Sequence, residues 1–185
     1  MKSWFTRINL LAVILTFCVV TLGAYVRLSD AGLGCPDWPG CYGQLIAPHP
    51  EHEEALKEFP GAQIDTGKAW KEMIHRYIAG ILGLLILVLA IIAIRNRHDA
   101  TQQVKLPLFL VVLVTFQALL GMWTVTHLVA PGIVTLHLLM GMLTLGLLWW
   151  QYLVSRTTGP AFSNRLPAMN LKPWATVALA VFFAQ

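Results

Sequence analysis

Charged side chains are scarce in this sequence. They make up 12% of the 185 residues, whereas soluble domains carry about 25%. Hydrophobic residues account for 57% of the chain, and its mean hydropathy is +0.65. The composition therefore excludes an ordinary soluble domain. It predicts an integral membrane protein, with the lipid bilayer as its first partner.

Cysteine is also scarce, because the chain holds only Cys18, Cys35 and Cys41. Cys18 falls in the middle of an apolar run, where a thiol is usually a small packing residue. Cys35 and Cys41 lie in a stretch rich in Gly and Pro, residues 23–43, whose composition predicts a tightly turned loop rather than a strand or a helix. Two further ligands at suitable spacing are missing, which argues against a zinc site.

Long apolar runs, by contrast, are abundant. A membrane-spanning helix takes about 20 residues, and four runs are long enough: Ile8–Val26, Ile78–Ile94, Leu106–Val125 and Ile133–Val154. They predict an all-α, polytopic membrane protein built as a four-helix transmembrane bundle. A fifth run starts at Trp174 and stops at Gln185. We therefore expect residues 174–185 to be a truncated fifth transmembrane helix, and the chain to be a fragment of something longer.

Basic residues set the expected orientation, since cytoplasmic loops are enriched in Lys and Arg. They precede the first run, lie between the second and third, and follow the fourth: Lys2, Arg7, Arg95, Arg97, Lys105, Arg156, Arg165 and Lys172. The N-terminus and a loop of residues 156–173 are therefore predicted in the cytoplasm. The pI of 9.2 reflects this topology rather than a nucleic-acid partner.

The long loop of residues 27–70 then lies on the extracytoplasmic side, where its acidic residues fit. On this oxidising side, Cys35 and Cys41 are predicted to form a disulfide bond. A structural staple and a redox-active pair both remain open for these two cysteines.

Two histidines stand at the outer ends of two apolar runs. His75 lies just before the second run, and His137 lies inside the fourth. Both runs cross from outside to inside, so the two imidazoles are expected at similar depth, pointing at each other across the bundle. Small residues follow at helical spacing and leave a shallow slot for a flat ligand: Ala79, Gly80 and Gly83 below His75, and Gly141 below His137.

An ionisable side chain inside a membrane span is costly and usually marks a site. Neutral imidazole is a good ligand for haem iron, whereas the spans offer no thiolate or carboxylate cluster for non-haem iron or copper. A histidine that only hydrogen-bonds a neighbouring helix is the alternative. The pair predicts that His75 and His137 ligate one haem iron, which makes residues 1–155 a four-helix, haem-binding half.

Three charged residues accompany the histidines. Glu72 lies one helical turn from His75 and is a candidate to take or deliver a proton; a solvated acid at a helix start, favoured by the helix dipole, is the alternative. Arg27 and Arg76 lie at the same membrane face. They are candidate partners for haem propionates, or they snorkel to lipid headgroups.

With these motifs the sequence resembles the haem A synthases. The matching segments cover most of residues 23–141: GAYVRLSDAG at 23–32, CPDWP at 35–39, EMIHR at 72–76, QALLG at 117–121 and VTLH at 134–137. The first loop and the Glu-x-x-His-Arg segment are specific, whereas the apolar stretches are not.

The resemblance implies an enzyme of the bacterial cytoplasmic membrane with eight helices in two similar halves, each holding one haem between two histidines. His75 and His137 fall on the ligand positions for the haem O substrate, and Glu72 falls on the essential carboxylate. Cys35 and Cys41 match an outer-loop pair that forms a disulfide in some members. The second half, with a haem B cofactor, is expected beyond Gln185.

The implied reaction oxidises a pyrrole methyl group of haem O to a formyl group, giving haem A for terminal oxidases. Oxygen is expected from water, and electrons are expected to leave through a redox partner. A haem O synthase and further copies of the chain are other candidate partners.

Two other functions fit parts of the pattern. A membrane haem b electron carrier with no catalytic role needs only the two histidines. A quinone-linked disulfide oxidase is also a four-helix membrane protein with cysteines in its outer loops, but such relays use two cysteine pairs, and only Cys35 and Cys41 lie outside here.

Overall fold

The structure is a computed structural model and describes residues 2–49, 51, 53–61, 63–99 and 102–157. Four of its helices are long and apolar enough to cross a membrane, and a short one lies in the loop of residues 29–65, which we call the outer loop after its predicted side: α1 (Lys2–Leu28), α2 (Glu53–Glu58), α3 (Thr66–Arg95), α4 (Lys105–Thr126) and α5 (Pro131–Thr157). The described part of the chain contains no β-strand. The prediction of an all-α, multi-pass membrane protein is thus confirmed. The fifth helix predicted over residues 174–185 lies outside the described residues, as does the predicted cytoplasmic loop from residue 158 on.

The ends of the long helices follow from local sequence. Asp65 caps α3, because its side chain accepts a hydrogen bond from the Lys68 N–H at 3.0 Å, and such caps satisfy an otherwise unpaired backbone donor. Pro131 starts α5, where its missing N–H costs nothing. α3 therefore begins three turns before the apolar run at Ile78, and its first turns carry the charged residues Lys68 to Arg76 above the span.

The predicted tight loop at residues 23–43 is partly wrong, because residues 23–28 continue α1. The loop starts only at Ser29. A single glycine such as Gly23 costs a helix about 1 kcal/mol, which is less than the loss of backbone hydrogen bonds at the edge of an apolar medium. Composition alone therefore placed the end of the helix too early.

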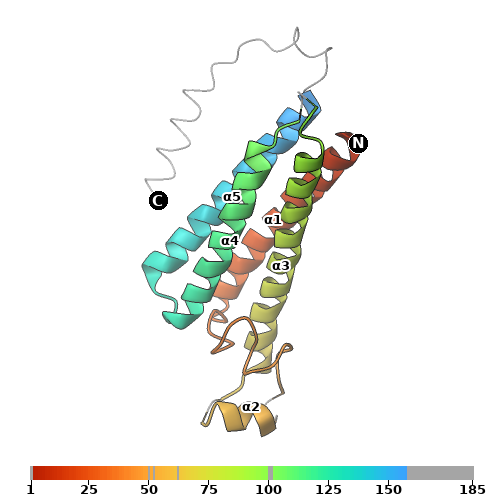
Figure 1. The fold of residues 1–185 in the computed structure, drawn as a ribbon. Coiled ribbons are helices and arrows are strands. Elements are labelled where there is room, and N and C mark those ends of the chain that lie inside the picture. The colour runs from red at the N-terminus through yellow and green to blue at the C-terminus, as the bar shows by residue number, and fades with distance from the viewer. Residues whose placement is uncertain (1, 50, 52, 62, 100–101, 158–185) are drawn as a thin grey trace. The chain divides into compact units, whose positions relative to one another are not determined.

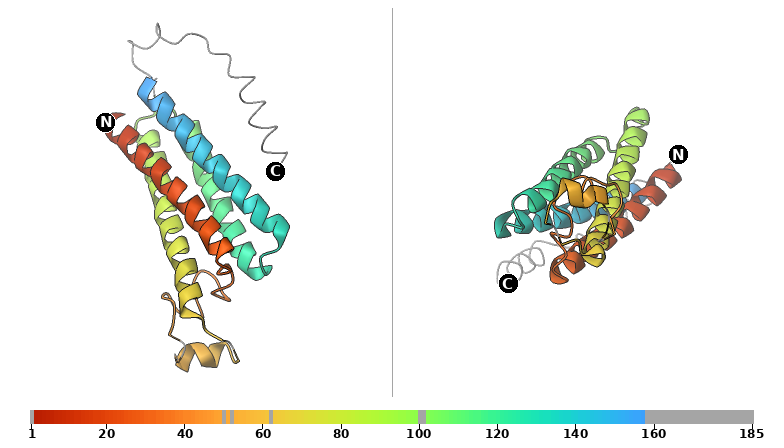
Figure 2. Two further views of the ribbon diagram at one scale, coloured as in Figure 1. Left: turned by 180° about the vertical axis from the view of Figure 1, so that it is seen from behind. Right: turned by 90° about the horizontal axis from the view of Figure 1, so that it is seen from below.

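The four long helices form an antiparallel bundle (Figure 1). α3 packs against both α1 and α4. α5 contacts α1 through a hydrogen bond from Asn9 Nδ2 to the Leu148 carbonyl at 3.4 Å, and it contacts α4 through a bond from Gln117 Nε2 to the His137 carbonyl at 3.2 Å. α3 and α5 therefore lie diagonally across the bundle, with α1 and α4 between them; the views of Figure 2 agree with this arrangement.

Two apolar clusters hold the molecule together. The first fills the half of the bundle away from the outer loop and takes buried residues from all four long helices: Phe5, Ala12, Val13, Leu82, Ile86, Leu89, Ala93, Leu110, Leu113 and Leu148. The second lies where the outer loop covers the start of α3: Cys35, Cys41, Tyr42, Ala47, Ala55, Ile64, Ala69 and Met73. The predicted histidines lie between these two clusters.

Candidate functional site

The two histidines come from the diagonal helices, His75 from α3 and His137 from α5. They lie at a similar depth in the bundle, because α1 places Gly23 against His75 and Val20, about one turn earlier, beside Gly141, which is one turn from His137. The Nδ1 atom of each ring is buried and has no hydrogen-bond partner. Leaving a buried polar atom unpaired costs about 1–3 kcal/mol, so a histidine that merely joins two helices is expected to use it. The described residues thus give no support to that alternative.

Each imidazole lies against a glycine of a flanking helix. A Cβ atom placed on Gly23 of α1 would lie 2.9 Å from Cε1 of His75, and one placed on Gly121 of α4 would lie 3.6 Å from Cε1 of His137. We call the level of the bundle that holds these four residues the histidine layer. Gly23 provides the room for His75, because any side chain at Gly23 would meet the ring, whereas a Cβ at Gly121 would make ordinary contact with His137.

The slot predicted from the sequence lies on the histidines' own helices. Gly80 is exposed on α3, and a Cβ at Gly80 or Gly83 would meet nothing within 4 Å, so the slot below His75 stays a prediction. Gly23 and Gly121 did carry a signal, since each stands at one end of a matched segment. The segments alone do not indicate which helices these glycines contact.

Gln117 adds a polar group to the histidine layer. It lies on α4, one turn before Gly121, and donates from Nε2 to the His137 carbonyl. Its Oε1 atom is buried and unpaired. Gly141 lets the amide approach α5, because a Cβ there would lie 3.1 Å from Gln117 Nε2. Gln117 belongs to the QALLG segment, but the sequence alone indicates no role for it.

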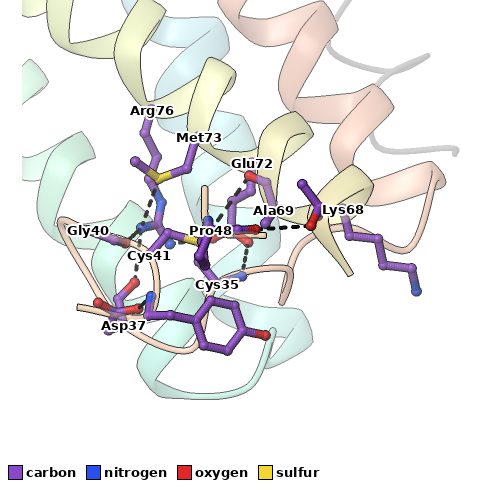
Figure 3. The surroundings of a disulfide bond; sticks show 12 residues. Cys35, Asp37, Gly40, Cys41, Pro48, Lys68, Ala69, Glu72, Met73 and Arg76 are labelled. Carbon is purple, nitrogen blue, oxygen red and sulfur yellow. Dashed lines mark hydrogen bonds and ion pairs between the residues drawn. A yellow bond between two sulfur atoms is a disulfide. The ribbon is translucent and has the colours of Figure 1, made fainter. Parts of the chain in front are cut away.

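Glu72 lies beneath the outer loop, one turn above His75, and only 5% of it is exposed. Its Oε2 accepts the Cys35 N–H at 3.0 Å, and its Oε1 pairs with Arg76 Nη2. Figure 3 shows the carboxylate beside the disulfide. The alternative of a solvated acid at a helix start is therefore wrong, because α3 begins at Thr66 and the loop folds over Glu72.

Arg76 fastens the outer loop to α3. Its Nη1 donates to the carbonyls of Asp37 at 3.0 Å and Pro39 at 3.3 Å, and also to that of Gly40. Guanidinium presents several donors in a fixed fork, so one side chain can hold a whole turn of backbone. Arg27 is different: it is exposed in the last turn of α1, one turn beyond Gly23.

The predicted disulfide is confirmed, since Cys35 and Cys41 are bonded with their Cα atoms 4.7 Å apart. Both residues are fully buried, which favours the structural staple, because thiol exchange needs access to a sulfur atom. Gly34, just before the disulfide, lies close to the backbone of α3: a Cβ there would lie 2.6 Å from the Lys68 carbonyl carbon.

Over the part of the chain that the structure describes, no group of three or more His, Cys, Asp or Glu is placed to hold a metal ion.

The arrangement suits one kind of chemistry. Two imidazoles whose Nδ1 atoms are buried without a protein partner could hold the iron of a haem, which would supply redox chemistry at this level of the bundle. The unpaired Gln117 Oε1 could accept a hydrogen bond from a ligand in the histidine layer.

The chain is similar to known proteins over nearly its whole length. The family model described as "Cytochrome oxidase assembly protein" matches residues 6–185. A protein named Heme A synthase from Shewanella oneidensis is 48% identical over 185 residues, which cover 99% of this chain and 54% of that protein. Heme A synthases from Exiguobacterium sp. and Halalkalibacterium halodurans are 34% and 29% identical over 124 and 120 residues, in both cases 64% of this chain and 35% of the relative.

The chain thus spans about half the length of the Shewanella protein and about a third of the other two. The family match nevertheless runs through both histidines, the disulfide loop and all four long helices. This chain therefore belongs to the COX15-CtaA family of cytochrome oxidase assembly proteins.

Proposed function

We propose that this chain serves haem A synthesis by holding haem O between His75 and His137. One observation carries the proposal: two half-buried imidazoles on diagonal helices, each packed on a glycine, have buried Nδ1 atoms without a protein partner. Relatives named Heme A synthase support the choice of haem O over other porphyrins. In this function a pyrrole methyl group is oxidised to a formyl group, with oxygen from water and with electrons passed to an acceptor.

The absorption spectrum of the haem-loaded chain tests the ligand pair. Two imidazole ligands produce low-spin iron, so the low-spin spectrum should be lost in both His75→Ala and His137→Ala. His127→Ala is the matched control, because His127 is an exposed histidine at the end of α4. A low-spin spectrum in both site variants would show that His75 and His137 are not the haem ligands.

Glu72 is the residue we assign to proton transfer during the oxidation. It is one turn from His75, and burial keeps bulk water away from its carboxylate. Its contacts with Cys35 and Arg76 also give it a positioning role in the loop. In the complete enzyme, Glu72→Gln should keep haem O binding and the disulfide but stop haem A formation. Product formation at the normal rate would leave Glu72 with the positioning role alone.

The propionates of the haem need cationic partners at the outer membrane face. Arg27 is the better placed of the two predicted arginines, because it is exposed one turn beyond Gly23, whereas both terminal nitrogens of Arg76 already bind the loop and Glu72. A propionate contact of Arg76 stays a prediction. Arg27→Gln should weaken haem binding, and unchanged affinity would assign Arg27 to lipid headgroups instead.

We further propose that the chain resides in a bacterial cytoplasmic membrane with its N-terminus in the cytoplasm, as the Lys and Arg distribution favours. A second haem of type B, a redox partner and a haem O synthase belong to the same proposal. A cysteine introduced into the outer loop at Leu45, which is 79% exposed, should react with a membrane-impermeant thiol reagent added to intact cells. Protection of this cysteine, with labelling only after the cells are opened, would reverse the orientation.

A further inference from the structure

A groove runs along the outside of the bundle where α1 and α5 meet. Its volume is about 510 Å³, within the range of about 300–1,000 Å³ that is typical of small-molecule sites. Its lining is apolar throughout: Val13, Ile14 and Phe17 from α1, and Met142, Leu145, Gly146 and Trp149 from α5. We call it the α1–α5 groove. A Cβ atom placed on Gly146 would meet nothing within 4 Å, so the missing side chain helps to keep the groove open.

α1 and α5 are joined on the side of the α1–α5 groove away from the histidines, where Asn9 donates to the Leu148 carbonyl and accepts from Gln151 Nε2, both at 3.4 Å. On the side toward the histidines α5 carries Gly141, and a Cβ placed there would lie 3.6 Å from Val20 Cγ2. The groove is therefore closed by polar contacts at one end, whereas at the other end no side chain of residue 141 stands between the helices.

The α1–α5 groove also continues from the histidine layer. Gly141 lies one turn from His137, and Leu145 lies one turn further on the same side of α5. Gly146 is nine residues beyond His137, which is about 13 Å along the helix axis. A flexible chain that leaves a porphyrin at His137 between α1 and α5 therefore meets the groove within the length of a few isoprene units.

We propose that the α1–α5 groove binds the isoprenoid side chain of the haem substrate. The proposal rests on the proposed function, because haem O carries a long farnesyl-derived chain on one pyrrole and haem B carries only a vinyl group there. The chain is apolar along its length, as is the groove. A lipid acyl chain is the competing occupant, but a chain tethered to a bound macrocycle has a high effective concentration at a site beside it.

The test compares haem O with haem B. Both are titrated into the full chain in detergent, and binding is followed by absorbance, for wild type and for Gly146→Leu, which fills the groove. Wild type should bind haem O at least tenfold more tightly than haem B. Gly146→Leu should abolish this preference while the haem B affinity stays within twofold. Gly132→Leu is the matched control, because Gly132 is also exposed, at the start of the same helix, and open space lies beside it; it should leave both affinities unchanged.

A second variant does not depend on filling the groove. Phe17 is 62% exposed, so Phe17→Ala removes part of the wall with little effect on folding, and it should lower the preference for haem O about threefold. Equal affinities of wild type for the two haems, or an equal loss of both affinities in Gly146→Leu, would overturn the binding of the isoprenoid chain in the α1–α5 groove. Haem B binding that still depends on His137 would then show that the proposed haem site itself is correct. If neither haem binds in a way that depends on the histidines, both the haem site and the role of the groove are wrong.

Discussion

A single methyl group at Gly23 should disturb His75. In Gly23→Ala the new Cβ would lie 2.9 Å from Cε1 of the ring, about 0.6 Å short of the ~3.5 Å at which two carbon atoms rest. The helix backbone is rigid, so the imidazole must turn. A side chain forced off its preferred rotamer costs about 0.5–1.5 kcal/mol, and 1.4 kcal/mol is a factor of about ten in affinity. We therefore expect haem B to bind Gly23→Ala three- to tenfold more weakly, measured by absorbance titration.

Gly121→Ala is the matched control for this prediction. Its Cβ would lie 3.6 Å from Cε1 of His137, which is ordinary contact, so the affinity should stay within about twofold. Alanine is a better helix former than glycine by about 1 kcal/mol, so neither variant should lose helix, and circular dichroism checks this. If both variants bind haem as wild type does, or if Gly121→Ala is the more damaged one, the glycines do not position the imidazoles.

Two further predictions concern the outer loop. Gly34→Ala should destabilise the packing of the loop on α3 by about 1–3 kcal/mol, because its Cβ would lie 2.6 Å from a backbone atom of Lys68. Gly32→Ala is the control and should cost much less, because its Cβ would lie 3.4 Å from the Val129 side chain. Limited proteolysis of the loop compares the two variants, and equal protection from the protease would contradict the contact at Gly34. Arg76→Lys should also expose the loop to protease, since one ammonium cannot replace the guanidinium on the loop carbonyls and Glu72. If protease cuts the loop of the Arg76→Lys variant no faster than that of wild type, the disulfide alone suffices to hold it.

The features of the fold that follow from the physical properties of the bilayer could be predicted from the sequence. Apolar length fixes how many helices cross a membrane, and the cost of an ionisable group in that medium made His75 and His137 visible. The pairing of Cys35 with Cys41 followed from compartment and proximity in sequence. Each of these signals is local to one segment of the chain.

The contacts between helices could not be predicted in the same way. A span that is apolar on all sides gives no stripe to show which face it buries, so the rotation that brings Gly23 against His75 has no counterpart in the hydropathy pattern. The burial of Glu72 depends in turn on a loop whose path is set by Arg76 and by the close approach at Gly34. Such contacts depend on packing in three dimensions, and one sequence without that packing leaves them open.

The hydrogen bonds from Arg76 to the carbonyls of the outer loop affect how a ligand can enter the site. Because the same side chain stands on the helix that bears His75, the loop is fixed over the start of that helix. In the proposed function we therefore expect the apolar haem substrate to reach the histidines laterally from the bilayer rather than through the loop.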